Sequence, residues 1–414
     1  MKRIITTLIL LITALNLQAQ FQLDAEVRPR YEYRHGYKSL FPDNTDPANY
    51  ISQRTRLNTG FVTDEYEIYI SMQNVRVWGD VKTMNTSDKN GTMLYEAWGS
   101  FKLSEAWKVK LGRQEILFDD ARIFGNVAWA QQARSHDAAS LQYYENGITA
   151  KFFAAYNQSA ENVVGNDLDP NNTYKALQTL WLNKKWEHIS LSLMFLNNGM
   201  QAKDEVAGDF PTYYSQTFGF YTKGEQNNIK YAASAYSQLG KDQMDNQVNA
   251  YQFSADLDYM LPKAHVGLGF ELMSGNDYGA PNGGENKAFS PYYGTNHKFN
   301  GLMDYFYVGN YFNNSGLLDL YFKGGVSLGE KSTLNAAVHY FQAAAEVDPM
   351  VDKGLGTELD ITYKYVLNKA VNIQAGYSQM FALEGMEYVK DNFDNNSNNW
   401  GWIMVTFKPI LFKN

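Results

Sequence analysis

The chain has 414 residues, no cysteine, 30 tyrosines and only 19% charged residues. The lack of cysteine excludes disulfides and thiolate-ligated metals, and the formal charge of −8 argues against a broad basic surface for nucleic acid. This length permits two or three soluble domains or one large β-barrel. A low share of charged residues with many tyrosines favours the barrel, which places aromatic residues at membrane interfaces.

The N-terminus has the pattern of a secretory signal peptide. Lys2 and Arg3 precede an apolar run over residues 4–15, and Ala19 is a small residue at a suitable cleavage position. We expect residues 1–19 to be removed, which takes two positive charges from the formal −8 and leaves −10. The run is short for a spanning helix, and no later stretch approaches about 18 apolar residues. The sequence predicts one mature domain over residues 20–414.

The first mature segment, residues 21–34, alternates strictly between two kinds of side chain. Every odd position is apolar or aromatic, and every even position is polar. A period of two predicts a strand, because successive side chains point to opposite faces. Soluble strands are usually about five to six residues long, whereas a transmembrane strand needs roughly 9–11. This segment therefore predicts a transmembrane strand.

The same alternation recurs along the chain in about eighteen segments. Short turns, such as 63–65 and 145–147, alternate with long polar connections. The long connections are 35–52, 79–92, 115–133, 157–173, 196–212, 237–247, 274–316, 342–354 and 381–399. This layout predicts an all-β, transmembrane, antiparallel up-and-down barrel with short periplasmic turns and long extracellular loops. A propeller or β-helix is disfavoured, because no sequence repeat of fixed length is present.

Two local features refine this assignment. The alternation slips near Asn74 in the segment 66–78, and a β-bulge there would explain the slip. The last strand spans residues 400–407 and extends as far as residue 412 in its longest version. Aromatic residues at the periplasmic strand ends are expected to form a girdle. They are Phe21, Trp107, Trp186, Tyr259, Tyr363 and Phe407.

If the polar positions of each alternating segment face the inside of the barrel, they predict two arcs of opposite charge there. Early strands supply cations and later strands supply carboxylates. The expected basic lumen residues are Arg28, Arg30, Arg34, Arg54, Arg56, Arg76, Lys108, Lys110 and Arg134, joined by Arg113 if a bulge turns it inward. The expected acidic residues are Asp256, Asp258, Glu271, Asp319, Glu358 and Asp360.

These arcs leave two interpretations open. Arginine stays charged and its planar fork suits carboxylates and phosphates, so a ladder of arginines would ease the passage of an anion. Alternatively, Glu26, Glu32 and Glu96 neutralise several arginines and leave a mixed-charge lumen of weak selectivity.

Two motif blocks resemble the alginate-export family of outer-membrane barrels. They comprise Gly112-Arg113-Gln114, residues 120–125, Trp129 and residues 134–138, and then residues 293–299 and 301–304 in the longest loop. The resemblance implies an eighteen-stranded monomeric barrel, with a basic lumen that passes an anionic polysaccharide and loops that act as gates. It also implies that Arg113, Arg122, Arg134 and Asp137 are lumen or loop-anchoring positions. Arg122 thereby joins the expected basic path and Asp137 the acidic arc, whereas the terminal Asn414 departs from the aromatic residue usual in such barrels.

The longest loop, 274–316, holds further candidates. Asn296, His297 and Asp304 have polar side chains suited to a site, and five aromatic residues could stack on sugars or pack the loop against the wall. These are Tyr292, Tyr293, Phe299, Tyr305 and Tyr307. A hydrolase would need a serine and a histidine in contact, but Ser135 and His136 are strand neighbours that point to opposite faces.

We therefore expect a non-enzymatic channel in the outer membrane of a Gram-negative cell, without cofactor or metal. It would pass a hydrophilic, anionic solute such as a polyuronate by passive diffusion or export. Its expected partners are outer-membrane lipid, the anionic or sugar solute and the barrel-assembly machinery, with no nucleic acid. The alternatives are a weakly selective porin with opposed arcs, a barrel-embedded hydrolase, and a non-conducting adhesin or receptor sealed by loop 274–316.

Overall fold

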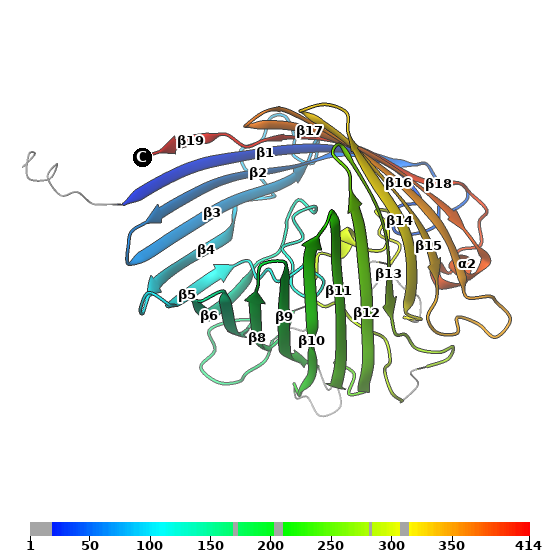
Figure 1. Cartoon of the computed structure of the whole chain (residues 1–414), viewed down its shortest axis with the longest axis horizontal. Coiled ribbons are helices and arrows are strands. Elements are labelled where there is room, and N and C mark those ends of the chain that lie inside the picture. The colour runs from blue at the N-terminus through cyan, green and yellow to red at the C-terminus, as the bar shows by residue number, and fades with distance from the viewer. Residues whose placement is uncertain (1–18, 169–172, 203–209, 281–283, 307–313) are drawn as a thin grey trace, which may run out of the picture.

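A computed structural model describes residues 19–168, 173–202, 210–280, 284–306 and 314–414. Its strands form one antiparallel sheet that closes on itself, because β1 pairs with β2 on one side and with β18 on the other (Figure 1). The strands are β1 (Gln20–His35), β2 (Ala48–Val62), β3 (Tyr66–Val77), β4 (Met93–Lys102), β5 (Trp107–Gln114), β6 (His136–Glu145), β7 (Ile148–Tyr156), β8 (Ala176–Lys185), β9 (Ile189–Gln201), β10 (Thr212–Gln226), β11 (Ile229–Lys241), β12 (Gln247–Met260), β13 (Ala264–Met273), β14 (Leu317–Ser327), β15 (Ser332–Gln342), β16 (Gly354–Asn368), β17 (Val371–Ala382), β18 (Asn398–Phe407) and β19 (Ile410–Lys413). The predicted eighteen-stranded barrel is confirmed.

The closing seam uses two strands where the sequence predicted one. β18 pairs with the second half of β1, from Val27 to His35, and β19 pairs with its beginning, from Gln22 to Asp24. Pro409 lies between β18 and β19 and has no N–H for a ladder hydrogen bond. The last predicted strand is thus interrupted, and both pieces close the barrel against β1.

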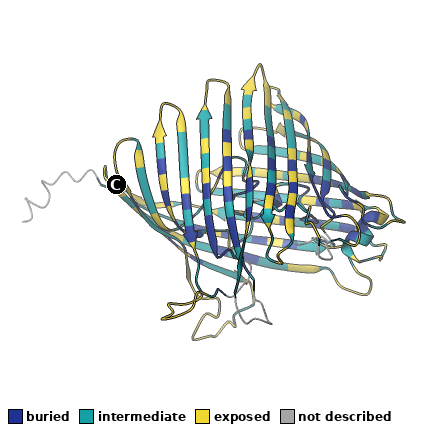
Figure 2. Ribbon diagram, turned by 90° about the horizontal axis from the view of Figure 1, so that it is seen from below, coloured by how far each residue is buried: buried dark blue, intermediate teal, exposed yellow. Residues whose placement is uncertain are grey.

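The outer face of the wall is apolar, as the alternation predicted. Along β3, Ile68, Ile70 and Met72 are exposed, whereas Ser71 and Gln73 between them are buried on the inner face. Figure 2 shows the same alternation of exposed and buried residues along the strands. Such a face suits the hydrocarbon layer of a membrane. Among the described residues, no helix has the length and apolar character to span a bilayer.

The predicted bulge near Asn74 is wrong. The pairing of β2 with β3 runs without a shift through Asn74 and Arg76, so both keep the outward parity of Met72. The register shifts instead between β3 and β4, where Tyr95 is the extra residue. This bulge turns the Tyr95 side chain inward, where it is 2% exposed, although the sequence placed it on the outer face.

The hydrophobic core of the protein lies inside the barrel. Two long connections fold inward from the long-loop end: loop A (residues 115–135, between β5 and β6) and loop B (residues 284–306, between β13 and β14). Loop B includes the short 3-10 helix η1 (Asn296–Lys298), visible within the barrel in Figure 1. The helix α2 (Glu384–Lys390) lies between β17 and β18 and contributes to the same core. The core residues from loop A include Phe118 and Phe124, those from loop B Met303 and Tyr305, and those from the wall Trp400 and Trp402.

Candidate functional site: the barrel lumen

The basic wall, formed by β1 and β2, holds loop A. The Arg28 guanidinium donates to the carbonyl oxygens of Ala128 at 2.7 Å, Trp129 at 3.1 Å and Ala130 at 3.2 Å. Arg30 donates to the Trp129 carbonyl at 2.7 Å and lies over the Trp129 ring. A loop inside a barrel must satisfy its own peptide groups, and these arginines serve that need for the carbonyls of loop A.

Carboxylates of the same wall neutralise the arginines. Glu26 pairs with Arg54 at 2.5 Å, and Glu32 pairs with both Arg30 and Arg34 at 2.8 Å. The side chains of Arg30 and Arg54 are about as buried as a core residue, whereas Arg34 is 30% exposed. Most of the expected arginine ladder is therefore part of the packed wall.

The remaining basic residues on the inner face are more accessible. Arg56 donates to Gln73 at 2.7 Å and lies over the Tyr95 ring. Lys108 pairs with Glu67 at 2.8 Å. The Lys110 ammonium lies 3.6 Å from the centre of the Trp98 ring.

Three residues expected in the lumen lie on the outer side of the wall. Arg76 pairs with Asp88 in the long connection that follows β3. Arg113 and Asp137 pair with each other at 2.7 Å, and both have outward positions in their strands. Arg113, for example, lies two residues after the exposed Leu111. The pairing of β4 with β5 continues through Arg113 without a shift, so no bulge turns that side chain inward.

Arg122 and Arg134 connect loop A to loop B. Arg122 forms a bidentate pair with Glu271 of β13, with both distances at 2.6 Å, and donates to Asn300 at 3.0 Å. It is 2% exposed. Arg134 donates to the Gly294 carbonyl at 3.1 Å. Both residues anchor loops, and Arg122 joins two loops and the wall at one point.

The acidic wall, formed by β12 to β16, holds loop B. Glu358 accepts the backbone N–H of Met303 at 2.8 Å, and Asp360 accepts that of Leu302 at 3.2 Å. Gly301 has a φ of +80°, and a Cβ there would lie 2.6 Å from the Glu358 carboxylate. This close approach requires glycine.

The two loops also bind each other through their backbones. Gly125 donates to the Tyr293 carbonyl at 2.8 Å, and Thr295 donates to that of Ala121 at 2.9 Å. Lys298 adds a hydrogen bond from its ammonium group to a loop A carbonyl at 2.8 Å. Loops A and B therefore form one continuous bridge between the basic and acidic walls.

The expected polar candidates of loop B are parts of this bridge. The His297 ring accepts or donates at Nδ1 to Asp304 at 2.8 Å and stacks on Trp129, with ring centres 4.6 Å apart. The Asn296 side chain lies 3.5 Å from the Arg122 guanidinium. Tyr305 is fully buried, as expected if the aromatic residues pack the loop, and Tyr307 lies outside the described residues.

The prediction that Ser135 and His136 are neighbours within one strand is wrong, because β6 begins at His136. His136 is buried in β6, where Nδ1 lies 3.0 Å from the Tyr174 hydroxyl. Its neighbour Ser135 precedes the strand.

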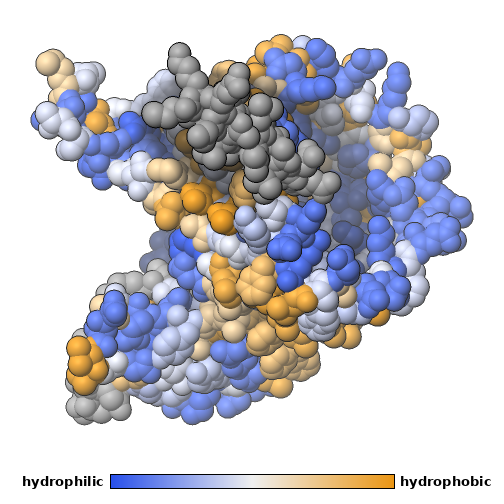
Figure 3. All heavy atoms as spheres, turned by 90° about the vertical axis from the view of Figure 1, so that its left-hand side faces the viewer, coloured by the Kyte–Doolittle hydropathy of each residue, from blue (hydrophilic) through white to orange (hydrophobic). Residues whose placement is uncertain are grey.

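Three lysines of the short-turn half face the lumen without a carboxylate partner. Lys110, Lys151 and Lys223 occupy inward positions of β5, β7 and β10, and within the described ranges none of them forms an ion pair. Viewed from the side of the C-terminus, the molecule is deeply hollowed and hydrophilic residues border the hollow (Figure 3). Lys151 and Lys223 were not among the expected basic residues of the lumen, although Lys151 shares the parity of the buried residues Phe153 and Ala155 in β7.

Asp119 of loop A lies close to this lysine group. It accepts hydrogen bonds from the Trp181 indole at 3.0 Å and from the Ser192 hydroxyl. Burial raises the pKa of Asp119 to about 6, although both hydrogen bonds and the field of Lys223 favour the ionised form. The charge of Asp119 therefore changes within a pH range that the outside of a cell commonly meets.

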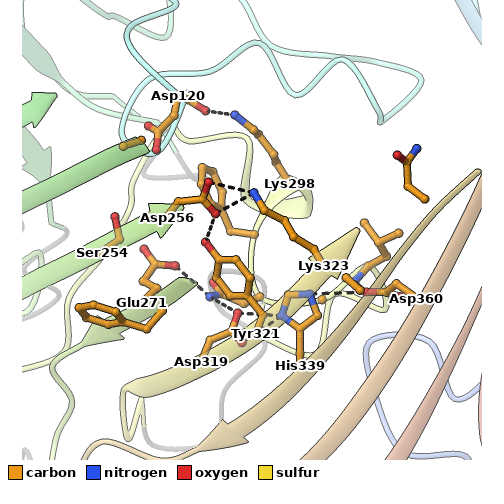
Figure 4. Close-up of a pocket in the computed structure, with 18 of the residues that line it drawn as sticks. Asp120, Ser254, Asp256, Glu271, Lys298, Asp319, Tyr321, Lys323, His339 and Asp360 are labelled. Atoms are coloured by element: carbon orange, nitrogen blue, oxygen red, sulfur yellow. Dashed lines mark hydrogen bonds and ion pairs between the residues drawn. The ribbon is translucent and has the colours of Figure 1, made fainter. Parts of the chain in front are cut away.

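A cavity of about 450 Å³ lies between loop B and the acidic wall (Figure 4). Asp256 of β12 and Lys323 of β14 form an ion pair at 2.7 Å on its surface, and the Tyr321 hydroxyl donates to Asp256 at 2.8 Å. Gly267 and Gly269 of β13 have inward positions, and the absence of a Cβ there makes room for the side chains of Asp258 and Tyr321.

The described residues contain no group of three or more histidine or acidic side chains arranged to hold a metal ion. Most charged residues of the lumen instead pair with each other or with loop backbones, and Lys110 and Lys151 lie against aromatic rings.

Comparison with known proteins agrees with this architecture. The family model for alginate export matches residues 19–384. Among solved structures, the fold is similar to that of three Pseudomonas aeruginosa proteins. OccK5 (OpdH) has a TM-score of 0.62 at 10% identity, with 95% of this chain and 98% of that chain covered. OpdO has 0.63 at 14%, with 95% and 98% covered, and OccK9 (OpdG) has 0.63 at 12%, with 94% and 98% covered.

No curated protein matches the chain. The family match spans most of the chain, and the barrel, its apolar outer face and its inward loops agree with it. The chain belongs to the alginate-export family and is an outer-membrane β-barrel channel.

Proposed function

We propose that this channel passes small hydrophilic solutes by passive diffusion and prefers anions. The observation that carries the proposal is the set of three lumen lysines that form no ion pair with any described carboxylate, Lys110, Lys151 and Lys223. Unpaired cations along a polar passage lower the electrostatic barrier for an anion and bind it only weakly. In this proposal the other partner is outer-membrane lipid, which covers the apolar outer face.

The lysines are better suited to this role than the arginines of the basic wall. Arg28, Arg30 and Arg54 have already committed their donors to loop carbonyls and to Glu26 and Glu32. A passing solute would have to displace these buried hydrogen bonds, at a cost of about 1.5–3 kcal/mol for each bond to a charged group. Lys110 and Lys151 lie against aromatic rings, which compete less strongly with a carboxylate.

A sugar acid is the solute class that we propose, including short polyuronates. Its carboxylate would pair with the lysines and its hydroxyl groups with the polar wall. Membership of the alginate-export family supports this assignment. Trp98 and Tyr69, which stack at 5.5 Å between ring centres on the same inner face, offer an aromatic surface near Lys110.

A second candidate is a weakly selective porin. The observation that favours it is the acidic wall, which lies across the closed sheet from Lys110 and Lys151 and in which Asp256 and Asp258 both pair with Lys323. Carboxylates on one side and lysines on the other produce a transverse field, which would select solutes by size more than by net charge.

Reversal potentials in a planar bilayer under a KCl gradient separate the two candidates. We expect an anion-selective potential for the natural protein, and a shift toward zero for the combined Lys110→Gln, Lys151→Gln and Lys223→Gln variant. Lys184→Gln is the matched control, because Lys184 lies on β8 with outward parity. A cation-selective potential, or a lysine variant that behaves like the natural protein, would refute the anion preference. Absence of current would favour the sealed adhesin or receptor.

Swelling of proteoliposomes tests the solute class. Uronate oligomers and neutral oligomers of equal length are compared at equal osmolarity. Faster entry of the uronates, lost in the lysine variant, is the expected result. Equal entry of the two sugars would favour the weakly selective porin.

A further inference from the structure

We propose that the cavity on the acidic wall binds the ammonium group of a small polyhydroxylated solute, of the size of an amino sugar. The site is built on Asp256 and lies between loop B and β12 to β16 (Figure 4). It uses none of the lysines that carry the proposed anion preference, and it requires only that the lumen admits small solutes.

The charges around Lys323 leave room for one more cation. The Lys323 ammonium lies 2.7 Å from Asp256 and 2.9 Å from Asp258, so two carboxylates share one positive charge. Asp258 Oδ1 is buried and has no hydrogen-bond partner among the described residues. Lys298 also lines the cavity, but its ammonium group donates to the Asp120 carbonyl and forms no ion pair with Asp256 or Asp258. The two carboxylates therefore keep an excess of negative charge, which the ammonium group of a solute stabilises.

Asp256 is the residue that a solute reaches. Its side chain is 26% exposed on the cavity surface, whereas Asp258 is 17% exposed behind it. The Tyr321 hydroxyl and Lys323 both donate to Asp256, and they hold the carboxylate in place. A carboxylate oxygen accepts more than one hydrogen bond, so Asp256 can accept from a solute ammonium without losing these two.

The opposite side of the cavity continues the negative potential. Asp319 pairs with His339 at 2.9 Å, and Asp360 lies 3.9 Å from the same ring. Two carboxylates again face one group that carries at most a single charge. This wall would repel a polyanion, in contrast to the lysine side of the lumen.

The size and lining of the cavity define the rest of the solute. A volume of about 450 Å³ lies within the range of small-molecule sites. Asn335, Thr362 and Ser254 add uncharged donors and acceptors to the lining, and Tyr321 adds an aromatic ring. Such a mixture suits a ring with several hydroxyl groups.

Three probes of one size test the proposal by their block of single-channel current. Glucosamine carries an ammonium group, glucose is neutral and glucuronate carries a carboxylate. We expect glucosamine to reduce the current of the natural protein at concentrations where glucose does not. Asp256→Asn should weaken the glucosamine block about ten-fold, because a hydrogen bond to a charged partner becomes one to a neutral partner. Asparagine retains an acceptor for Tyr321 and Lys323.

Glu105→Gln is the matched control, since it removes one negative charge in the turn between β4 and β5, away from the residues that line the cavity. It should leave the glucosamine block unchanged. Natural conductance of Asp256→Asn in the absence of sugar, with the usual heat-modifiable migration of a folded barrel, shows that the variant is intact. An equal block by glucose, a block unchanged in Asp256→Asn, or equal weakening in Glu105→Gln would each overturn the site. The reversal potential of the lysine variant is a separate readout, so failure of the anion preference is distinguishable.

Discussion

The basic wall and the acidic wall both hold an inward loop by hydrogen bonds to its backbone, but one wall donates these bonds and the other accepts them. Each carries buried charges, and each holds one inward loop. On the basic wall, Arg28 and Arg30 donate to carbonyl oxygens of loop A. On the acidic wall, Glu358 and Asp360 accept N–H groups of loop B. The two walls thus meet opposite poles of the peptide group.

This difference shows that a charged residue in the lumen does not by itself indicate the charge of the solute, because it can serve a loop instead. A buried charge without a partner is costly, and so is a buried peptide group without a hydrogen bond. In this barrel the buried charges of the wall form hydrogen bonds with the buried peptide groups of the loops, so both kinds of group have a partner. Within the described part of the chain, the lysines of the short-turn half, Lys110, Lys151 and Lys223, have no such partner, and in the proposed function they are the cations that meet the solute.

Arg122→Ala should have the largest effect on the bridge between the two walls, because Arg122 connects both loops to the wall. Its loss leaves Glu271 buried without its bidentate partner, which costs about 3–5 kcal/mol. We expect faster hydrogen exchange at Gly125 and Thr295, whose amides bridge the two loops, and a larger single-channel conductance. Arg113→Ala is the control, since that arginine pairs with Asp137 on the outer side. Unchanged exchange at both amides would show that Arg122 does not hold the bridge.

Arg28→Ala should affect one wall only. Three carbonyls of loop A lose a charged donor, and each such hydrogen bond contributes about 1.5–3 kcal/mol. Hydrogen exchange at Ala130 and Arg134 should accelerate, whereas the Phe299 amide in loop B should keep its protection. Equal acceleration in both loops would mean that the two walls do not act separately.

Substitution of Glu358 separates charge from hydrogen bonding on the acidic wall. Glu358→Gln keeps an oxygen that accepts the Met303 N–H, so its effect on loop B should stay below about 1 kcal/mol. Glu358→Leu removes the acceptor and leaves the buried N–H unsatisfied, at a cost of about 1–3 kcal/mol. Hydrogen exchange at Met303 reports both. If glutamine is as damaging as leucine, the negative charge itself holds the loop.

The smallest expected effect is a dependence of selectivity on pH. Asp119 has a pKa raised to about 6, so it is neutral below that pH and negative above it. The negative form offsets part of the field of Lys223. The anion preference should therefore fall as the pH rises from 5 to 7, when measured as the reversal potential. Asp119→Asn should abolish this dependence, and a preference that rises with pH would contradict it.

The strand pattern allowed most of the wall to be predicted. The alternation in residues 21–34 placed Arg28, Arg30 and Glu32 on the inner face, where the structure has them buried. The prediction that Arg76 faces the lumen is wrong, because the sequence does not show which pair of strands contains the bulge. The bulge lies at Tyr95, on the neighbouring strand.

The site was harder to predict than the wall, because its partners are distant in the chain. Nothing near Arg28 in the sequence indicates that it binds the carbonyls of residues 128–130, about one hundred residues later. The sequence did indicate neutralisation by Glu26 and Glu32, and the structure shows both pairs. Lys223 was missed because β10 extends to Gln226, beyond the last apolar position of its alternation.

The division of roles between arginines and lysines can be tested by two variants that each remove two positive charges. One combines Arg28→Gln with Arg30→Gln, and the other combines Lys110→Gln with Lys151→Gln. The reversal potential of each is measured under the same KCl gradient. We expect the arginine pair to keep the natural anion preference and the lysine pair to lose most of it. Loss of the preference in the arginine pair, with no change in the lysine pair, would contradict the account.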